Sequence, residues 1–102
     1  MVTLGPALGV AVANDVKSTG AKAAVVTYAM NNDVYRLLAS GDIAFTIDQQ
    51  PWLQGYMSVD SLWFYKKNDT ILGANQSIAT GPVVLDKTNS AQVQEYAKAG
   101  DR

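Results

Sequence analysis

Apolar and polar residues alternate in blocks along the first half of the chain, and each block has the length of a helix or a strand. The run "AAVVTYAM" (residues 23–30) is continuously apolar, and "IAFTI" (residues 43–47) forms a second such run. Between them, Val34, Leu37 and Leu38 form one apolar stripe at helical spacing. Continuous apolar runs of this length are typical of strands covered on both faces in a parallel sheet.

Proline, glycine and asparagine mark where these elements begin and end. Pro6 suits the first turn of a helix predicted over residues 7–18, and Gly20 suits its end. Asn31 or Asn32 can cap the next helix, which Gly41 ends. With a short β-type run at residues 2–4, the order is β-α-β-α-β, which predicts parallel strands and right-handed crossovers.

The longest predicted helix begins at Pro51 and runs to about Lys67. Its apolar residues cover more than one stripe, so this helix needs partners on two sides. An aromatic series at helical spacing is more typical of a core or packing surface than of a surface on which a ligand stacks. The apolar and aromatic positions are Trp52, Leu53, Tyr56, Met57, Val59, Leu62, Trp63, Phe64 and Tyr65.

The last part of the chain reads as one extended segment and one helix. Gly81-Pro82 interrupts "IATGPVVLD" (residues 78–86), which therefore suits an edge strand or a crossing segment. Asn89 and Gln92 resemble a capping box that opens a helix through Ala99.

Composition narrows the class of protein. The 102 residues form at most one domain, with a net charge of −1 and no basic stripe, so we expect no nucleic-acid partner. No apolar run approaches the roughly 20 residues that span a bilayer, so we expect no membrane insertion. The chain has no cysteine and no histidine, which excludes disulfides, thiol nucleophiles, the usual zinc sites and histidine acid–base catalysis. We therefore expect no enzyme activity, metal or cofactor.

The stretch "DQQP" places Asp48, Gln49 and Gln50 between a strand and the helix that Pro51 opens. These side chains can cap the helix and hydrogen-bond the connecting backbone, or Gln49 can hold a polar ligand. Both interpretations remain open at this stage. Tyr28, at the end of an apolar run, is the better candidate for stacking on a ligand ring.

The remaining polar features give weaker evidence for a binding site. The stretch from Gly5 to Gly9 lacks a phosphate-loop pattern, although a helix N-terminus there can attract an anion or a polarised oxygen atom. Four aspartates in loops lack the spacing of a calcium loop, and we expect them to be solvated. They are Asp33, Asp42, Asp69 and Asp86.

Four motifs, taken in order, resemble the C-terminal part of type I periplasmic sugar-binding proteins of bacterial ABC importers, which include ribose-binding proteins. The motifs are "VTLGPALG", "AAVVTYAM", "SGDIAFTIDQQPWLQGY" and "ATGPVVLDKTN". The likeness covers nearly the whole chain, and the third motif is the most specific. Proteins of this family have two α/β lobes joined by hinge strands and close around one sugar.

The resemblance implies how the chain is divided. Residues 1–102 form a single partial domain with a three-layer α/β/α arrangement, a short parallel sheet and helices on both faces, flavodoxin-like and half of the type I binding-protein fold. Residues 1–48 would belong to the C-terminal lobe, and residues 49–77 would pack on the N-terminal lobe. Residues 78–102 would cross back and end in a helix.

The resemblance also implies a ligand site at strand ends. Gln49 matches a hinge amide that hydrogen-bonds sugar hydroxyls, and Gly5, with Leu4, lies where a polar pair often sits. Tyr28 falls where an aromatic residue precedes an acid, but Ala29 replaces that acid here. The loss removes charge-assisted hydrogen bonds of about 1.5–3 kcal/mol each.

The implied function is capture of a small sugar (a pentose, hexose or related polyol) in the periplasm, for delivery to an ABC permease. The chain would act only when completed by the missing N-terminal lobe, and its exposed apolar surface also favours a homodimer. Two alternatives stay open: the ligand-sensing lobe of a sugar-responsive regulator, and a stand-alone flavodoxin-like protein that binds a small ligand.

Overall fold

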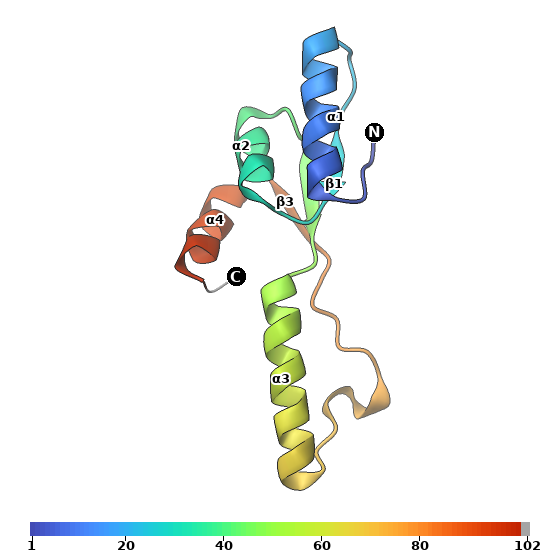
Figure 1. Ribbon diagram of the computed structural model, residues 1–102, viewed down its shortest axis with the longest axis vertical. Helices are drawn as coiled ribbons and strands as arrows, with labels where there is room; N and C mark the ends of the chain where they lie inside the picture. Colours follow the sequence, from blue (N-terminus) through green and yellow to red (C-terminus); the bar gives the residue numbers. More distant parts are fainter. Residues whose placement is uncertain (101–102) are drawn as a thin grey trace.

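The computed structural model describes residues 1–100, so the last two residues of the predicted segment 78–102 lie outside it. Helices and strands alternate until β2 and then give way to a long excursion before the last strand (Figure 1). The elements are α1 (Pro6–Thr19), β1 (Val26–Tyr28), α2 (Asn32–Ser40), β2 (Phe45–Asp48), α3 (Pro51–Asn68), the 3-10 turn η1 (Leu72–Asn75), β3 (Val83–Asp86) and α4 (Ser90–Ala99).

The strands form one three-stranded sheet in the order β1-β2-β3. β1 and β2 are parallel, with Tyr28 opposite Ile47, whereas β3 pairs with β2 in the antiparallel direction. The sheet is therefore mixed, which corrects the expected parallel sheet. The reason is that the chain leaves β2 at its carboxyl end, passes through α3, and re-enters the sheet from that same end. The predicted strand at residues 2–4 is reduced to a single parallel bridge between Val2 and Val26.

Most of the boundary signals act as predicted. Gly20 and Gly41 end α1 and α2 with φ angles of 66° and 84°, in the left-handed region that favours glycine. The Asn31 side chain accepts a hydrogen bond from the Val34 N–H at 2.8 Å and caps α2. The predicted capping box is wrong, because the Asn89 side chain accepts from the Asp86 N–H instead of capping α4.

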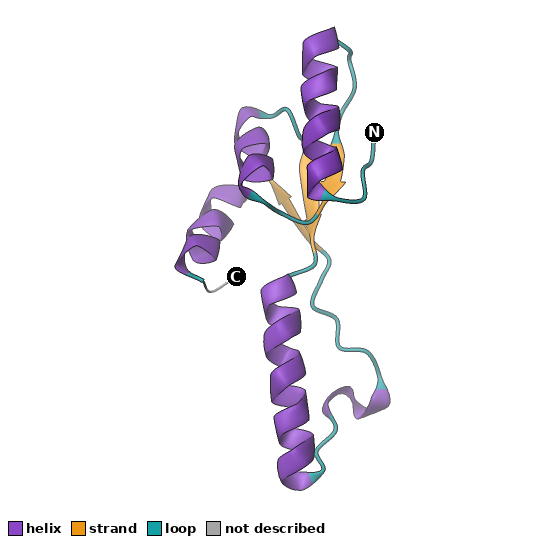
Figure 2. Cartoon of the chain, in the orientation of Figure 1, coloured by secondary structure: helices purple, strands orange, loops and turns teal. Residues whose placement is uncertain are grey.

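The core lies on one face of the sheet. Ala13 of α1 packs with Val25, and with Val34 and Leu38 of α2, in one buried cluster. A second cluster joins α2, β3 and α4 through Tyr35, Leu85 and Val93. Because the side chains of Val25 and Leu85 lie on the same face of the sheet, α1, α2 and α4 all cover that face (Figure 2).

The opposite face of the sheet has no helix over it among residues 1–100. Val26, Tyr28, Phe45 and Ile47 are half-buried there, and Val84 is 52% exposed. The α/β class and the partial binding-protein fold are confirmed, but the second helical layer and the strands buried on both faces are not observed. The continuous apolar runs give no signal for this, because they do not distinguish which face is covered.

Helix α3 extends away from the sheet and the other helices (Figure 1). None of its residues is buried, and Val59 and Leu62 are 67% and 69% exposed. Trp52 stacks on Tyr56 with ring centroids 5.2 Å apart, within a row of aromatic side chains that face solvent. These aromatic residues are not core of this chain, which leaves a packing surface as their interpretation. No helix in the described residues is long and apolar enough to span a membrane.

Candidate functional site

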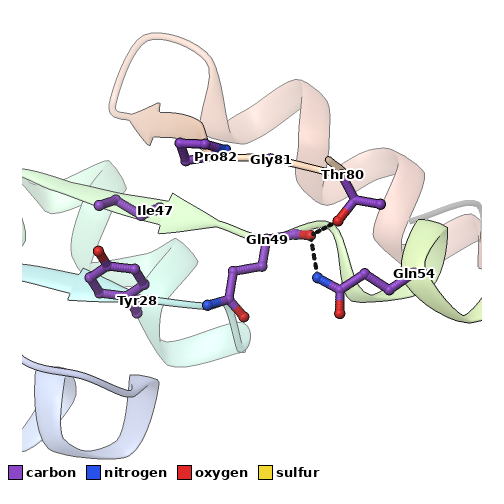
Figure 3. Close-up of a pocket in the computed structure, with 7 residues that line it drawn as sticks. All are labelled: Tyr28, Ile47, Gln49, Gln54, Thr80, Gly81 and Pro82. Carbon is purple, nitrogen blue, oxygen red and sulfur yellow. Dashed lines mark hydrogen bonds between the residues drawn. The ribbon is translucent and has the colours of Figure 1, made fainter. Parts of the chain in front are cut away.

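A cleft of about 410 Å³ lies at the carboxyl ends of β1 and β2, where open α/β sheets bind their ligands. Tyr28 and Ile47 contribute from the strand ends, and Gln49 and Gln54 from the connection into α3 (Figure 3). The returning segment completes the lining, which consists of Tyr28, Ile47, Gln49, Gln54, Thr80, Gly81 and Pro82. Gly81-Pro82 is a cis peptide bond.

Gln49 is held by its main chain and leaves its side chain available. Its carbonyl oxygen accepts hydrogen bonds from Thr80 Oγ1 at 2.9 Å and from Gln54 Nε2 at 2.8 Å. The side chain is exposed and extends along the cleft on the side of Tyr28 (Figure 3). Its amide has no hydrogen-bond partner within residues 1–100. The amide can therefore offer both a donor and an acceptor to a ligand.

Asp48 and Gln50 fix the backbone on either side of Gln49. Asp48 is 3% exposed, and its Oδ1 accepts a hydrogen bond from the Gln50 N–H at 2.9 Å. Gln50 occupies the N-cap position of α3, but its side-chain amide donates to the Thr80 carbonyl oxygen instead. The interpretation of Gln50 as a side-chain cap is thus wrong, whereas the predicted hydrogen bonds to connecting backbone are present.

The structure brings two of the four predicted site residues together. Tyr28 and Gln49 both line the cleft, while Gly5 lies at the start of α1, where its carbonyl accepts from Thr27 Oγ1 at 3.0 Å. Ala29 lines a neighbouring cavity of about 250 Å³ together with Asp48. No sequence pattern marks Gln54 or Thr80, because their role depends on two segments far apart along the chain.

Ala29 has a φ angle of 62°, in the left-handed region that alanine enters only at a cost. Its N–H donates to the Ile47 carbonyl oxygen at 2.9 Å, so the parallel strand pair holds this conformation. The position suits glycine, asparagine or aspartate better than alanine, because these residues tolerate positive φ angles.

Replacing Ala29 with glycine should therefore raise the free energy of unfolding by about 1 kcal/mol, since the left-handed strain disappears. Urea denaturation followed by circular dichroism measures the change. Ala39→Gly is the matched control: Ala39 is exposed within α2, and glycine there should lower stability by about 1 kcal/mol. A loss of stability in Ala29→Gly would contradict the strain argument.

No residue that lines the cleft carries a charge at neutral pH. The carboxyls with shifted pKa lie at the other end of the sheet. Hydrogen bonds from Lys17 and Ser40 lower the pKa of Asp42, and hydrogen bonds from Thr88 lower that of Asp86. No cluster of metal-ligating side chains occurs within residues 1–100. The cleft therefore suits a neutral ligand with hydroxyl or amide groups.

The fold is a partial α/β architecture with a cleft at its strand ends, the place where open α/β sheets bind their ligands. No protein-family model and no curated protein matches the sequence. Among solved structures, the chain is similar to a carbohydrate transporter from Acidothermus cellulolyticus 11B, whose crystal structure was determined in complex with myo-inositol. The TM-score is 0.86 at 37% sequence identity, over 99% of this chain and 35% of that chain.

The resemblance to part of a periplasmic-type sugar-binding protein is therefore confirmed in fold and in sequence. The chain spans 35% of the length of the transporter that it matches.

Proposed function

We propose that this chain is the C-terminal part of the solute-binding component of a bacterial ABC transporter. It captures a small neutral sugar or polyol when two lobes close over the cleft, and it does no covalent chemistry. The parent protein works in the periplasm and delivers its ligand to a permease. The supporting observation is the unpartnered Gln49 amide at a strand-end cleft, in a chain 37% identical to part of a transporter crystallised with myo-inositol.

The chemistry of the cleft supports a polyhydroxyl ligand. The Gln49 amide can donate to one hydroxyl and accept from another, and the Tyr28 ring and Pro82 offer apolar surface to the C–H face of a ring. A charged ligand would find no counter-ion among the lining residues. Ala29 removes one further source of negative charge, so neutral hydrogen bonds must provide the affinity.

The cleft is open, and two apolar surfaces of the chain are uncovered. The first is α3, and the second is the sheet face formed by Val26, Tyr28, Phe45 and Ile47. The remaining 65% of the transporter has no counterpart in these residues and is the proposed cover for both. A ligand pocket normally buries most of its ligand, so this chain alone should bind sugar weakly.

The test is calorimetric titration with myo-inositol of the chain alone and of the chain mixed with the part of the transporter that it does not match. Binding should appear only in the mixture. Gln49→Leu should then weaken binding about tenfold or more, because a buried hydroxyl loses its partner. Gln92→Leu, at an exposed position of α4, is the matched control and should bind like the unmodified chain. No heat from the mixture with any pentose, hexose or inositol would contradict the proposal.

A further inference from the structure

We infer that Thr80 and Gln54 are positioning residues of the proposed sugar site: they hold the peptide that carries Gln49, so that its side-chain amide faces the cleft. The inference rests on the proposed function for the identity of the ligand. The positioning role itself is argued from the hydrogen bonds around one peptide unit. That unit, the Gln49–Gln50 peptide, joins the end of β2 to the start of α3.

Both ends of the Gln49–Gln50 peptide are engaged. Its carbonyl oxygen accepts from Thr80 Oγ1 at 2.9 Å and from Gln54 Nε2 at 2.8 Å, which fills both lone pairs. Its N–H donates at 2.9 Å to Oδ1 of Asp48, a carboxylate that is 3% exposed. A hydrogen bond to a buried carboxylate is stronger than a neutral one, so this end is the firmer anchor.

The hydrogen bonds come from three different parts of the chain. Asp48 ends β2, Gln54 lies in the first turns of α3, and Thr80 lies on the returning segment, 31 residues after Gln49. A reciprocal bond runs from the Gln50 side-chain amide to the Thr80 carbonyl oxygen. The two connecting segments, residues 49–50 and 80–82, are thereby tied to each other at the edge of the cleft (Figure 3).

Backbone strain at the same place agrees with this assignment. Gln50 has a φ angle of 55°, a left-handed conformation that a non-glycine residue holds only when its surroundings fix it. The surroundings here are the hydrogen bonds just described. Glycine at position 81 allows the approach, because a Cβ there would lie 3.0 Å from the Asp48 carbonyl oxygen. The strained backbone at Gln50 thus accompanies a connection that places the Gln49 side chain at the cleft.

Two measurements test the inference, and the first needs no sugar. Hydrogen exchange of the Gln50 N–H is followed by NMR in the 102-residue chain and its variants. Thr80→Val removes the hydroxyl donor and keeps the shape of the side chain, and Gln54→Leu removes the other donor. Each should speed exchange about three- to tenfold, because loosening the carbonyl end loosens the bond to Asp48. Thr80→Ser, which keeps the hydroxyl, should exchange like the unmodified chain.

Thr70→Val is the matched control, since Thr70 lies exposed in the loop after α3 and no hydrogen bond within residues 1–100 uses its hydroxyl. It should leave exchange unchanged. Equal exchange in the unmodified chain, Thr80→Val and Gln54→Leu would overturn the inference while leaving the proposed function untouched.

The second measurement is myo-inositol affinity in the completed, two-part protein. Thr80→Val should weaken binding about three- to tenfold, although Thr80 need not touch the sugar, and Thr80→Ser should restore it to within about twofold. Full affinity in Thr80→Val, or an equal loss in Thr80→Ser, overturns the positioning role. If the unmodified protein binds no sugar, the proposed function fails, and the sugar-positioning role fails with it.

Discussion

Lysine in place of both Val59 and Leu62 should abolish assembly of the chain with the remaining part of the transporter and leave its own stability unchanged. Both side chains are about two-thirds exposed on α3, so the isolated chain loses no buried contact. If the proposed assembly buries them, each forfeits about 1.5–3 kcal/mol of burial, and the two together weaken association at least about 100-fold. Analytical ultracentrifugation measures the association, and urea denaturation measures the stability.

Asp60→Lys, next to Val59 and less exposed, is a control that changes charge on the same helix without removing an apolar side chain. Its association should fall far less than that of the double variant. If the double variant assembles normally, α3 is not the packing surface. If the unmodified chain self-associates and the double variant does not, the cover of this helix is a second copy.

Gly9→Ala should be strongly destabilising, although it adds a single methyl group. Gly9 lies where α1 crosses β1, and a Cβ there would lie 2.5 Å from Thr27 Oγ1 and 2.7 Å from Thr27 Cβ. Thr27 cannot yield easily, because its hydroxyl accepts from Thr3 Oγ1 at 2.9 Å and donates to the Gly5 carbonyl at 3.0 Å. Overpacking of this kind costs about 1–3 kcal/mol, a large share of the roughly 5–15 kcal/mol of a typical domain.

Gly55→Ala is the matched control for that substitution. Gly55 also lies within a helix, but apart from its chain neighbours and the adjacent helix backbone no atom is within 4 Å of the position where its Cβ would lie. Alanine at this position should leave stability unchanged or raise it slightly, through helix propensity. Equal urea midpoints for the two alanine variants would show that α1 can move away from β1 at little cost.

The sequence predicts the helices of this fold well because their boundary signals are local. Pro6, Gly20, Asn31, Gly41 and Pro51 each act within a few residues, and each lies at the helix end where the pattern places it. The capping box at Asn89 fails for a physical reason. The β3 backbone offers the Asn89 side chain partners at the Asp86 N–H and the Val84 carbonyl, which no local pattern reveals.

Sheet architecture is less predictable, because it depends on contacts far apart in the sequence. The apolar runs indicate strands, but they do not show that β3 returns in the antiparallel direction or that one face stays uncovered. The candidate site follows the same rule. Gln49 and Tyr28 are recognisable at strand ends, whereas Thr80 acquires its role only because the chain comes back to Gln49.

The hydrogen bonds between residues 49–50 and Thr80 also have an architectural consequence. The chain leaves the sheet and returns to it through two adjacent connecting segments, so residues 51–79 form an insertion. The small lobe made of residues 1–50 and 80–100 contains both buried clusters by itself. A short linker between the two connecting segments could replace residues 51–79 and leave that lobe whole. The same position is therefore suited to the insertion of other protein segments.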